Sequence, residues 1–177
     1  EDVAPISFLH EVLSPKGFNA SQIRDIFRSL SSSQSGKRFF TTEWEVLRDR
    51  EYLWIQKKGS SQLIPEIIIE EIERTPSFVI PRDKHIACLD ADQLIHPLTI
   101  RKWEKGDKFV PLGMNGKKKV SDYLTDKKFS LFQKENQYVV CSGEDIVWLV
   151  NERSDHRYRI TDSTQRILLI QIKKDGQ

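Results

Sequence analysis

The spacing of apolar residues changes once along this chain, in a serine-rich stretch near residue 35, and that change limits the folds available to it. Before the change, apolar side chains recur at helical intervals of three and four, as at Ile23, Ile26, Phe27 and Leu30. After it, short apolar runs favour strands, interrupted by short helices at irregular spacing. Helices followed by strands in this irregular order predict the α+β class and exclude a doubly wound α/β fold.

Two short amphipathic helices are predicted before the change. The first covers residues 5–13 and is ended by Pro15 and Gly17. The second follows Asn19, which together with Gln22 three residues later resembles a capping box. We expect the two helices to pack as a hairpin.

A domain boundary is predicted between Thr75 and Arg82, where prolines bracket a short apolar run. Before it, strands are expected at 39–41, 44–48 and 52–56, with a tight turn at Asp49-Arg50. Residues 66–73 fit a strand or a helix, and their isoleucine run favours a strand. The predicted domains are therefore residues 1–75 and 76–177, the alternative being a strand inside one continuous domain.

The second half of the chain reads as mostly strands. Apolar runs predict strands at 85–89, 98–103, 137–141, 146–150 and 166–172. Short helices are expected at 120–125 and 129–135. This half is therefore predicted to be a β-rich domain with short helices.

Composition excludes several classes of protein. The 28 Lys and Arg against 26 Asp and Glu give a net charge of only +2, which excludes a histone-like nucleic-acid binder. No run of 18 apolar residues indicates a membrane span. Cys88 and Cys141 lack metal-site spacing, which argues against structural zinc and fits a reducing cytoplasmic compartment. The chain begins at Glu1 and its single methionine is Met114, which suggests a fragment.

No catalytic motif is present. Residues 35–38 (SGKR) end like a phosphate loop but lack its first glycine and final hydroxyl residue. Residues 142–145 (SGED) lack the second glycine and final serine of a pyrophosphatase loop, and a β-turn fits them better. The four histidines are scattered. We therefore expect no catalytic residue, metal site or cofactor in this chain.

Positive charge is concentrated in residues 101–128. This segment carries nine basic and four acidic residues, or +5, which leaves −3 for the rest of the chain. Lys117, Lys118 and Lys119 lie in it on a glycine-flanked loop, which could follow an RNA backbone. The alternative is a loop that the lysines merely keep solvated.

A second basic cluster and two aromatic side chains share this ambiguity. Arg153, Arg157 and Arg159 form the cluster, with Asp155 available as an internal partner. Trp103 and Phe109 flank a Gly-Asp turn and could stack on bases, but aromatic residues beside a hairpin more often belong to the core.

The same segments resemble a known family. Residues 101–123 (RKWEKGDKFVPLGMNGKKKVSDY) closely resemble the C-terminal domain signature of bacterial tRNA(Ile)-lysidine synthases. Residues 90–92, 146–148 and 153–161 match the same family, and the helical pair with its β-hairpin resembles the domain that precedes this one. The resemblance implies that the last domain is similar to an unusual β-sandwich shared with a phenylalanyl-tRNA synthetase β-subunit domain.

The resemblance also implies a function. Family members adenylate C2 of the wobble cytidine with ATP, and lysine then displaces AMP to form lysidine. The adenylation domain, which would hold ATP and Mg²⁺, is N-terminal in the family and is missing here. This chain is thus expected to be inactive alone and to hold tRNA(Ile) with a CAU anticodon. A homodimer through the full-length enzyme is allowed.

Carried over by position, the expected RNA-binding residues are Arg101, Lys117, Lys118, Lys119, Arg153 and Arg157. The sequence departs from the family at Phe129-Ser130-Leu131, where Val-Pro-Arg is common, and at His156, where an acidic residue is common. The alternative function is a non-catalytic protein-interaction module whose basic loop docks on an acidic partner or on its own enzyme core.

Overall fold

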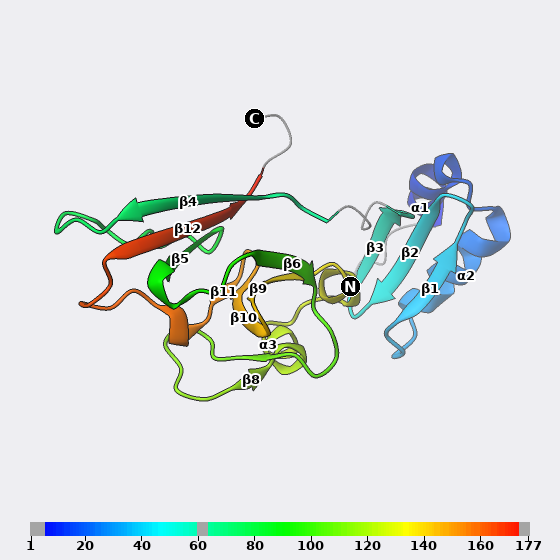
Figure 1. Ribbon diagram of the computed structural model, residues 1–177. Helices are drawn as coiled ribbons and strands as arrows, with labels where there is room; N and C mark the ends of the chain where they lie inside the picture. Colours follow the sequence, from blue (N-terminus) through cyan, green and yellow to red (C-terminus); the bar gives the residue numbers. More distant parts are fainter. Residues whose placement is uncertain (1–5, 60–63, 174–177) are drawn as a thin grey trace. The chain divides into compact units, whose positions relative to one another are not determined.

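The computed structural model describes residues 6–59 and 64–173, which form two compact units (Figure 1). Unit 1 comprises residues 1–63 with 130–132, and unit 2 comprises residues 64–129 with 133–177. Each unit combines short helices with small antiparallel sheets. The predicted α+β class is therefore confirmed.

Unit 1 packs two α-helices, joined by a short 3-10 helix, against a three-stranded sheet. Its helices are α1 (Ile6–Leu13), η1 (Ser14–Lys16) and α2 (Ala20–Leu30). Its antiparallel strands, in the order β1-β2-β3, are β1 (Lys37–Phe40), β2 (Trp44–Asp49) and β3 (Tyr52–Lys57). The predicted capping box is present: the Asn19 side chain accepts from the Gln22 N–H at 2.9 Å, and the Gln22 side chain accepts from the Asn19 N–H. The core lies where Leu13, Ile23 and Val46 meet.

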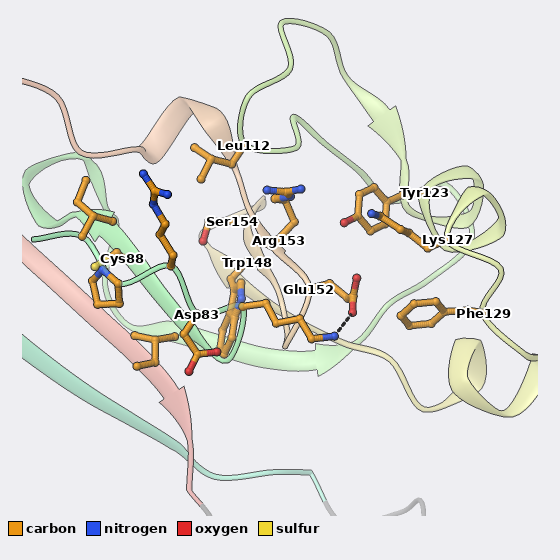
Figure 2. Close-up of a pocket in the computed structure, with 15 residues that line it drawn as sticks. Asp83, Cys88, Leu112, Tyr123, Lys127, Phe129, Trp148, Glu152, Arg153 and Ser154 are labelled. Atoms are coloured by element: carbon orange, nitrogen blue, oxygen red, sulfur yellow. Dashed lines mark hydrogen bonds and ion pairs between the residues drawn. The ribbon is translucent and has the colours of Figure 1, made fainter.

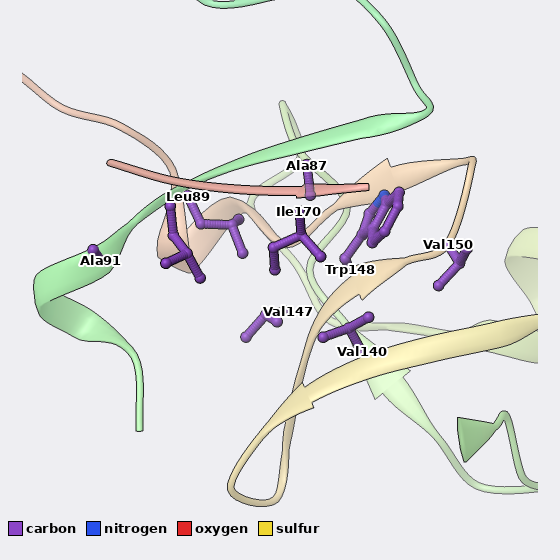
Figure 3. Close-up of a cluster of buried hydrophobic side chains, with 9 residues drawn as sticks. Ala87, Leu89, Ala91, Val140, Val147, Trp148, Val150 and Ile170 are labelled. Atoms are coloured by element: carbon purple, nitrogen blue, oxygen red, sulfur yellow. The ribbon is translucent and has the colours of Figure 1, made fainter. Parts of the chain in front are cut away.

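Unit 2 is built on two sheets packed face to face. The first has the order β4-β12-β5, formed by β4 (Ile67–Glu73), β5 (Ile86–Asp90) and β12 (Arg166–Ile172). The second has the order β11-β10-β9-β6, formed by β6 (Leu98–Lys102), β9 (Tyr138–Ser142), β10 (Asp145–Leu149) and β11 (Arg153–Ser154). Figure 3 shows the core between them, where Leu89 and Ile170 of the first sheet meet Val140 and Trp148 of the second.

A second layer covers the other face of the four-stranded sheet. It contains α3 (Val120–Asp126) and the small ribbon of β7 (Lys108–Phe109) and β8 (Lys118–Lys119). Phe109 and Leu124 pack there against Val139 and Cys141 of β9. Because β9 is buried on both faces, its sequence YVVCS begins with four consecutive apolar residues and does not alternate between apolar and polar. The remaining short helices are η2 (Ala91–Gln93), η3 (His156–Tyr158) and α4 (Leu131–Glu135).

The units divide between residues 63 and 64, earlier than the boundary predicted between Thr75 and Arg82. Residues 67–73 form the strand that their isoleucine run favoured, and this strand pairs along its whole length with β12, from Ile67↔Ile172 to Glu73↔Arg166. The prolines at 76 and 81 therefore mark a loop between two strands of one sheet and not a linker between domains. Sequence reasoning could not see the partner strand, which lies far along the chain.

A buried carboxylate ties two loops of unit 2 together. Asp155 is fully buried, and its Oδ2 accepts from the Val110 N–H at 2.9 Å. Both its oxygens also accept from the Arg157 guanidinium, at 3.0 and 3.1 Å. Arg157 Nη1 donates in addition to Asp145 Oδ1 at 2.8 Å. The hydrogen bonds that Arg157 donates to Asp155 and Asp145 raise the Arg157 pKa, so the guanidinium stays charged. The network fixes the 108–112 segment against residues 153–158.

Two further carboxylates of unit 2 are held ionised by neighbouring cations. Burial raises the pKa of Asp107, but two hydrogen bonds from Arg101, at 2.8 and 3.0 Å, and one from the Glu104 N–H outweigh that effect and lower it below the ordinary 3.8. Burial likewise raises the pKa of Asp145, and hydrogen bonds from Arg157 and Tyr158 outweigh it.

Replacing the buried carboxylate tests its role. Asp155→Ala leaves the Arg157 guanidinium and the Val110 N–H without their main acceptor, so we expect the free energy of unfolding to fall by about 3 kcal/mol. Urea denaturation followed by tryptophan fluorescence measures this change. Asp162→Ala serves as the control. Asp162 is fully exposed, and its ion pair with Arg74, at 3.7 Å, is long, so its loss should cost little stability. Equal losses in the two variants would contradict the assigned role.

The lowered pKa values predict a loss of stability in acid. A carboxylate whose pKa is lower in the folded than in the unfolded protein stabilises the fold above the unfolded pKa, and this contribution disappears as pH falls through the folded pKa. The free energy of unfolding should therefore decrease as the pH drops below 3.8, the ordinary pKa of an aspartate. The fall should be shallower in Asp107→Asn, measured by urea denaturation at roughly pH 2 to 5. An identical pH dependence in both proteins would refute the contribution of Asp107.

Candidate nucleic-acid interface

Two of the six residues predicted to contact RNA are occupied within the fold. Arg101 donates to both carboxylate oxygens of Asp107 and to the Lys102 carbonyl. Arg157 is held by Asp155 and Asp145. In both arginines most of the guanidinium donors already have acceptors, so the geometry favours a role in shaping loops over direct contact with phosphate. The alternative that Asp155 is an internal partner is the one observed.

The predicted lysine triplet is divided between two faces of the β7–β8 ribbon. Lys118 is paired with Phe109, which is fully buried, and forms an ion pair with Asp126 at 2.5 Å. Lys119 is paired with Lys108, and both side chains are exposed. Successive side chains of a strand point to opposite faces, so Lys118 and Lys119 face different ways. Lys117 is exposed just before the strand.

A groove lined by cations lies beside the inner face of this ribbon (Figure 2). It consists of a hollow of about 740 Å³ and an adjoining one of about 210 Å³, which share Leu112, Tyr123, Lys127 and Arg153. The cations that line it come from the β4–β5 loop, the β8–α3 region and β11: Arg82, Lys84, Lys118, Lys127 and Arg153. We call this surface the basic groove.

The charges of the basic groove are only partly neutralised. Lys84 Nζ lies 2.9 Å from Glu152 Oε1, and Lys118 is paired with Asp126. Among the residues that the structure describes, Arg82, Lys127 and Arg153 form no side-chain hydrogen bond or ion pair with another residue. Five cations against Asp83, Asp126 and Glu152 leave a net +2. Unneutralised positive charge gathered in a concave surface attracts and concentrates phosphate.

Most aromatic side chains near the groove belong to the core. Phe109 is fully buried, and Trp103 donates through Nε1 to the Lys134 carbonyl at 2.5 Å. Trp148 and Tyr123 are only 1% and 5% exposed. The core alternative therefore holds for Trp103 and Phe109. The large apolar side chains left at the surface of the groove include Leu112, Ile80 and Met114, which are exposed, and Phe129, which is half-buried.

Sequence reasoning missed three of the groove cations. Lys127 was counted in the basic segment at 101–128 but was not chosen, because no motif marked it. Arg82 and Lys84 lie outside that segment and reach the groove only because the β4–β5 loop folds beside β11. No signal in a single sequence links residues that far apart.

Residues 6–59 and 64–173 contain no sign of a metal site, a membrane span or a reactive thiol. No group of three or more His, Cys, Asp or Glu side chains suited to a metal ion occurs in them. No helix in these ranges is long and apolar enough to span a membrane. Burial raises the pKa of the Cys88 thiol to about 11 and also raises that of Cys141. Both thiols therefore stay protonated at neutral pH and are poorly suited to act as nucleophiles.

Comparison with solved structures relates the fold to two proteins. One, titled "Crystal structure of TILS C-terminal domain", aligns with a TM-score of 0.53 at 20% identity, over 63% of this chain and 85% of that one. The other is an N-terminal fragment of the phenylalanyl-tRNA synthetase β-subunit from Pyrococcus horikoshii, with a TM-score of 0.51 at 14% identity, over 65% and 41%. At these identities the likeness shows the fold, and it includes the synthetase relationship that the sequence resemblance implied.

Sequence comparison gives full-length relatives. The chain is 50% identical over 175 residues to the tRNA(Ile)-lysidine synthase of Bacteroides thetaiotaomicron, covering 97% of this chain and 41% of that protein. It is 41% identical over 181 residues to the enzyme of the same name from Parabacteroides distasonis, covering 94% and 41%. The chain thus spans about two fifths of the length of these relatives.

Two family models match separate parts of the chain. The model described as the TilS substrate binding domain matches residues 2–58, which fall in unit 1. The model described as the TilS substrate C-terminal domain matches residues 98–171, which fall largely in unit 2. This chain belongs to the tRNA(Ile)-lysidine synthase family and carries the substrate binding domain and C-terminal domain of its C-terminal region.

Proposed function

We propose that this chain is the tRNA-holding part of a tRNA(Ile)-lysidine synthase and that its basic groove contacts the phosphate backbone of the tRNA. The observation that carries the proposal is the convergence of Arg82, Lys127 and Arg153 in one groove of unit 2, none of them neutralised by a carboxylate. Lys127 and Arg153 lie within residues 98–171, which match the model described as the TilS substrate C-terminal domain. Phosphate contacts supply affinity and fix the register of the RNA without reading its sequence.

The mechanism we propose is positioning. A tRNA gripped at one place presents its other parts at fixed distances, so a distant active site meets the wobble cytidine at high effective concentration. Lys127 and Arg153 would hold phosphates directly. Arg101 and Arg157 would act indirectly, by holding the loops that form the groove. Lys117 and Lys119, exposed near the outer face of the ribbon, would add long-range attraction.

The chemistry of the whole enzyme is also part of the proposal. Adenylation of the cytidine by ATP, with Mg²⁺, would take place in the part of the relatives that this chain does not span. The substrate would be tRNA(Ile) with a CAU anticodon, and the enzyme would act in the cytoplasm, with a homodimer allowed. The residues of this chain would bind and orient the tRNA.

The groove assignment predicts the effect of removing its two central cations. Lys127→Ala combined with Arg153→Ala should weaken tRNA binding about tenfold at low salt, because two charge-assisted phosphate contacts are lost. The slope of log K against log salt concentration should become shallower by about 1.8, since each phosphate contact contributes about 0.9. Fluorescence anisotropy with labelled tRNA from 50 to about 200 mM salt measures both quantities.

The matched control removes the same charge outside the groove. Lys117→Ala with Lys119→Ala also deletes two cations, but neither side chain lines the groove. We expect this pair to lower affinity less than the groove pair does. If the control pair weakens binding as much as the groove pair, or if the groove pair leaves the salt slope unchanged, the groove is not the phosphate site.

The division of labour predicts the behaviour of the chain on its own. Supplied with ATP, Mg²⁺, lysine and tRNA(Ile), it should bind the tRNA and form no lysidine, because none of its described residues forms a catalytic set. Nucleoside analysis of the recovered tRNA by mass spectrometry measures the product. Lysidine formed by the purified chain would overturn this division.

A further inference from the structure

A carboxylate stands among the cations of the basic groove, where phosphate binding gives it no purpose. Glu152 lies in the turn between β10 and β11, and its side chain is only 12% exposed. Its Oε1 accepts from Lys84 Nζ at 2.9 Å. Within the described part of the chain, Oε2 has no hydrogen-bond donor. A carboxylate in this position repels phosphate, so a groove that bound only a phosphate backbone would be better without it.

The walls of the groove are also not those of a purely electrostatic site. Leu112 is 40% exposed and Phe129 is half-buried, and both line the larger hollow. Figure 2 shows Glu152 between Arg153 on one side and Phe129 on the other. The volume of about 740 Å³ lies within the range of pockets that enclose a small organic ligand. Cations, an apolar wall and a hydrogen-bond acceptor therefore converge on one space.

We propose that the basic groove holds an unpaired nucleotide whose base carries an amino group. Arg153 and Lys127 bind its phosphate, Phe129 and Leu112 contact the base, and Glu152 accepts a hydrogen bond from the exocyclic amine. The proposal rests on the proposed function, because it names the RNA element that the tRNA site takes. An unpaired nucleotide offers its face for stacking and its edge for hydrogen bonding, whereas a paired one offers neither to this groove.

The amino group follows from the chemistry of the acceptor. A carboxylate has lone pairs and no proton to donate at neutral pH, so it selects donors. Adenine, cytosine and guanine present an exocyclic NH₂, whereas uracil has none and can donate only through its ring N3–H. The competing explanation is that Glu152 only anchors Lys84, in which case its removal changes the binding of every RNA equally.

Short oligonucleotides separate these explanations. The full chain is titrated by fluorescence anisotropy with labelled eight-nucleotide oligo(A), oligo(C) and oligo(U), and with an RNA duplex. We expect tighter binding of oligo(A) and oligo(C) than of oligo(U), and the weakest binding for the duplex. Glu152→Met, which removes the acceptor and the charge at similar length, should weaken oligo(A) and oligo(C) about fivefold. Binding of oligo(U) should be unchanged or tighter, because a negative charge is lost.

Two further variants complete the test. Glu152→Gln keeps one acceptor oxygen and should retain part of the preference for oligo(A) and oligo(C) over oligo(U). Glu144→Gln removes an exposed carboxylate from the β9–β10 turn, away from the groove, and should shift all three oligonucleotides equally. Far-ultraviolet circular dichroism establishes that each variant is folded.

The outcomes distinguish this inference from the proposed function. Equal changes for all three oligonucleotides in Glu152→Met, or tighter binding of the duplex by the unmodified chain, overturn the unpaired-nucleotide site. So does tRNA binding without any binding of the oligonucleotides. If instead Lys127→Ala with Arg153→Ala leaves tRNA binding intact, the proposed function of the groove fails, whatever the oligonucleotides show.

Discussion

The arrangement of unit 2 depends on one buried charge. A fully buried carboxylate is tolerated only when its oxygens accept hydrogen bonds. Asp155 accepts them from the Val110 N–H and from the Arg157 guanidinium. Those donors come from two segments that backbone hydrogen bonds also join, such as the one from the His156 N–H to the Val110 carbonyl at 2.7 Å. Leu112 and Arg153, which lie on either side of the network, are two of the four residues that the two hollows of the groove share. A structural ion pair therefore fixes the shape of the surface that we assign to RNA.

The same logic decides which cations are available to a ligand. A net charge of +2 for the chain says little about binding, because the fold neutralises some cations and leaves others open. Arg101 and Arg157 both match the family signature, yet Arg101 is neutralised by Asp107, and Arg157 by Asp155 and Asp145. Arg82 and Lys127 match no motif and are left open. A residue that matches the family signature can therefore stabilise the fold through an internal ion pair and need not contact the ligand.

Local features of the fold were predictable from sequence, and long-range ones were not. The capping box at Asn19, the turn at Arg50 and the isoleucine-rich strand at 67–73 are set by neighbouring residues, and the structure contains all three. The pairing of β4 with β12 depends on residues far apart, and without it a proline-bracketed loop was mistaken for a domain boundary. The basic groove could not be predicted from the sequence for the same reason, because its cations come from three separate segments. Lys118 and Lys119 face opposite sides because both lie in the strand β8, and a strand of two residues is too short to be recognised from its hydrophobic pattern.

The position of β12 in its sheet has a consequence for how the chain acquires its structure. β12 is the central strand between β4 and β5, and the pair Ile67↔Ile172 joins positions 105 residues apart in sequence. Until that strand leaves the ribosome, β4 and β5 have no partner between them and half of the interface with the second sheet is open. Unit 1, whose contacts are mostly local, can fold as it is made, whereas unit 2 must wait for its last strand and then close a long loop slowly. During that interval the exposed strand edges of unit 2 are where aggregation or capture by a chaperone would begin.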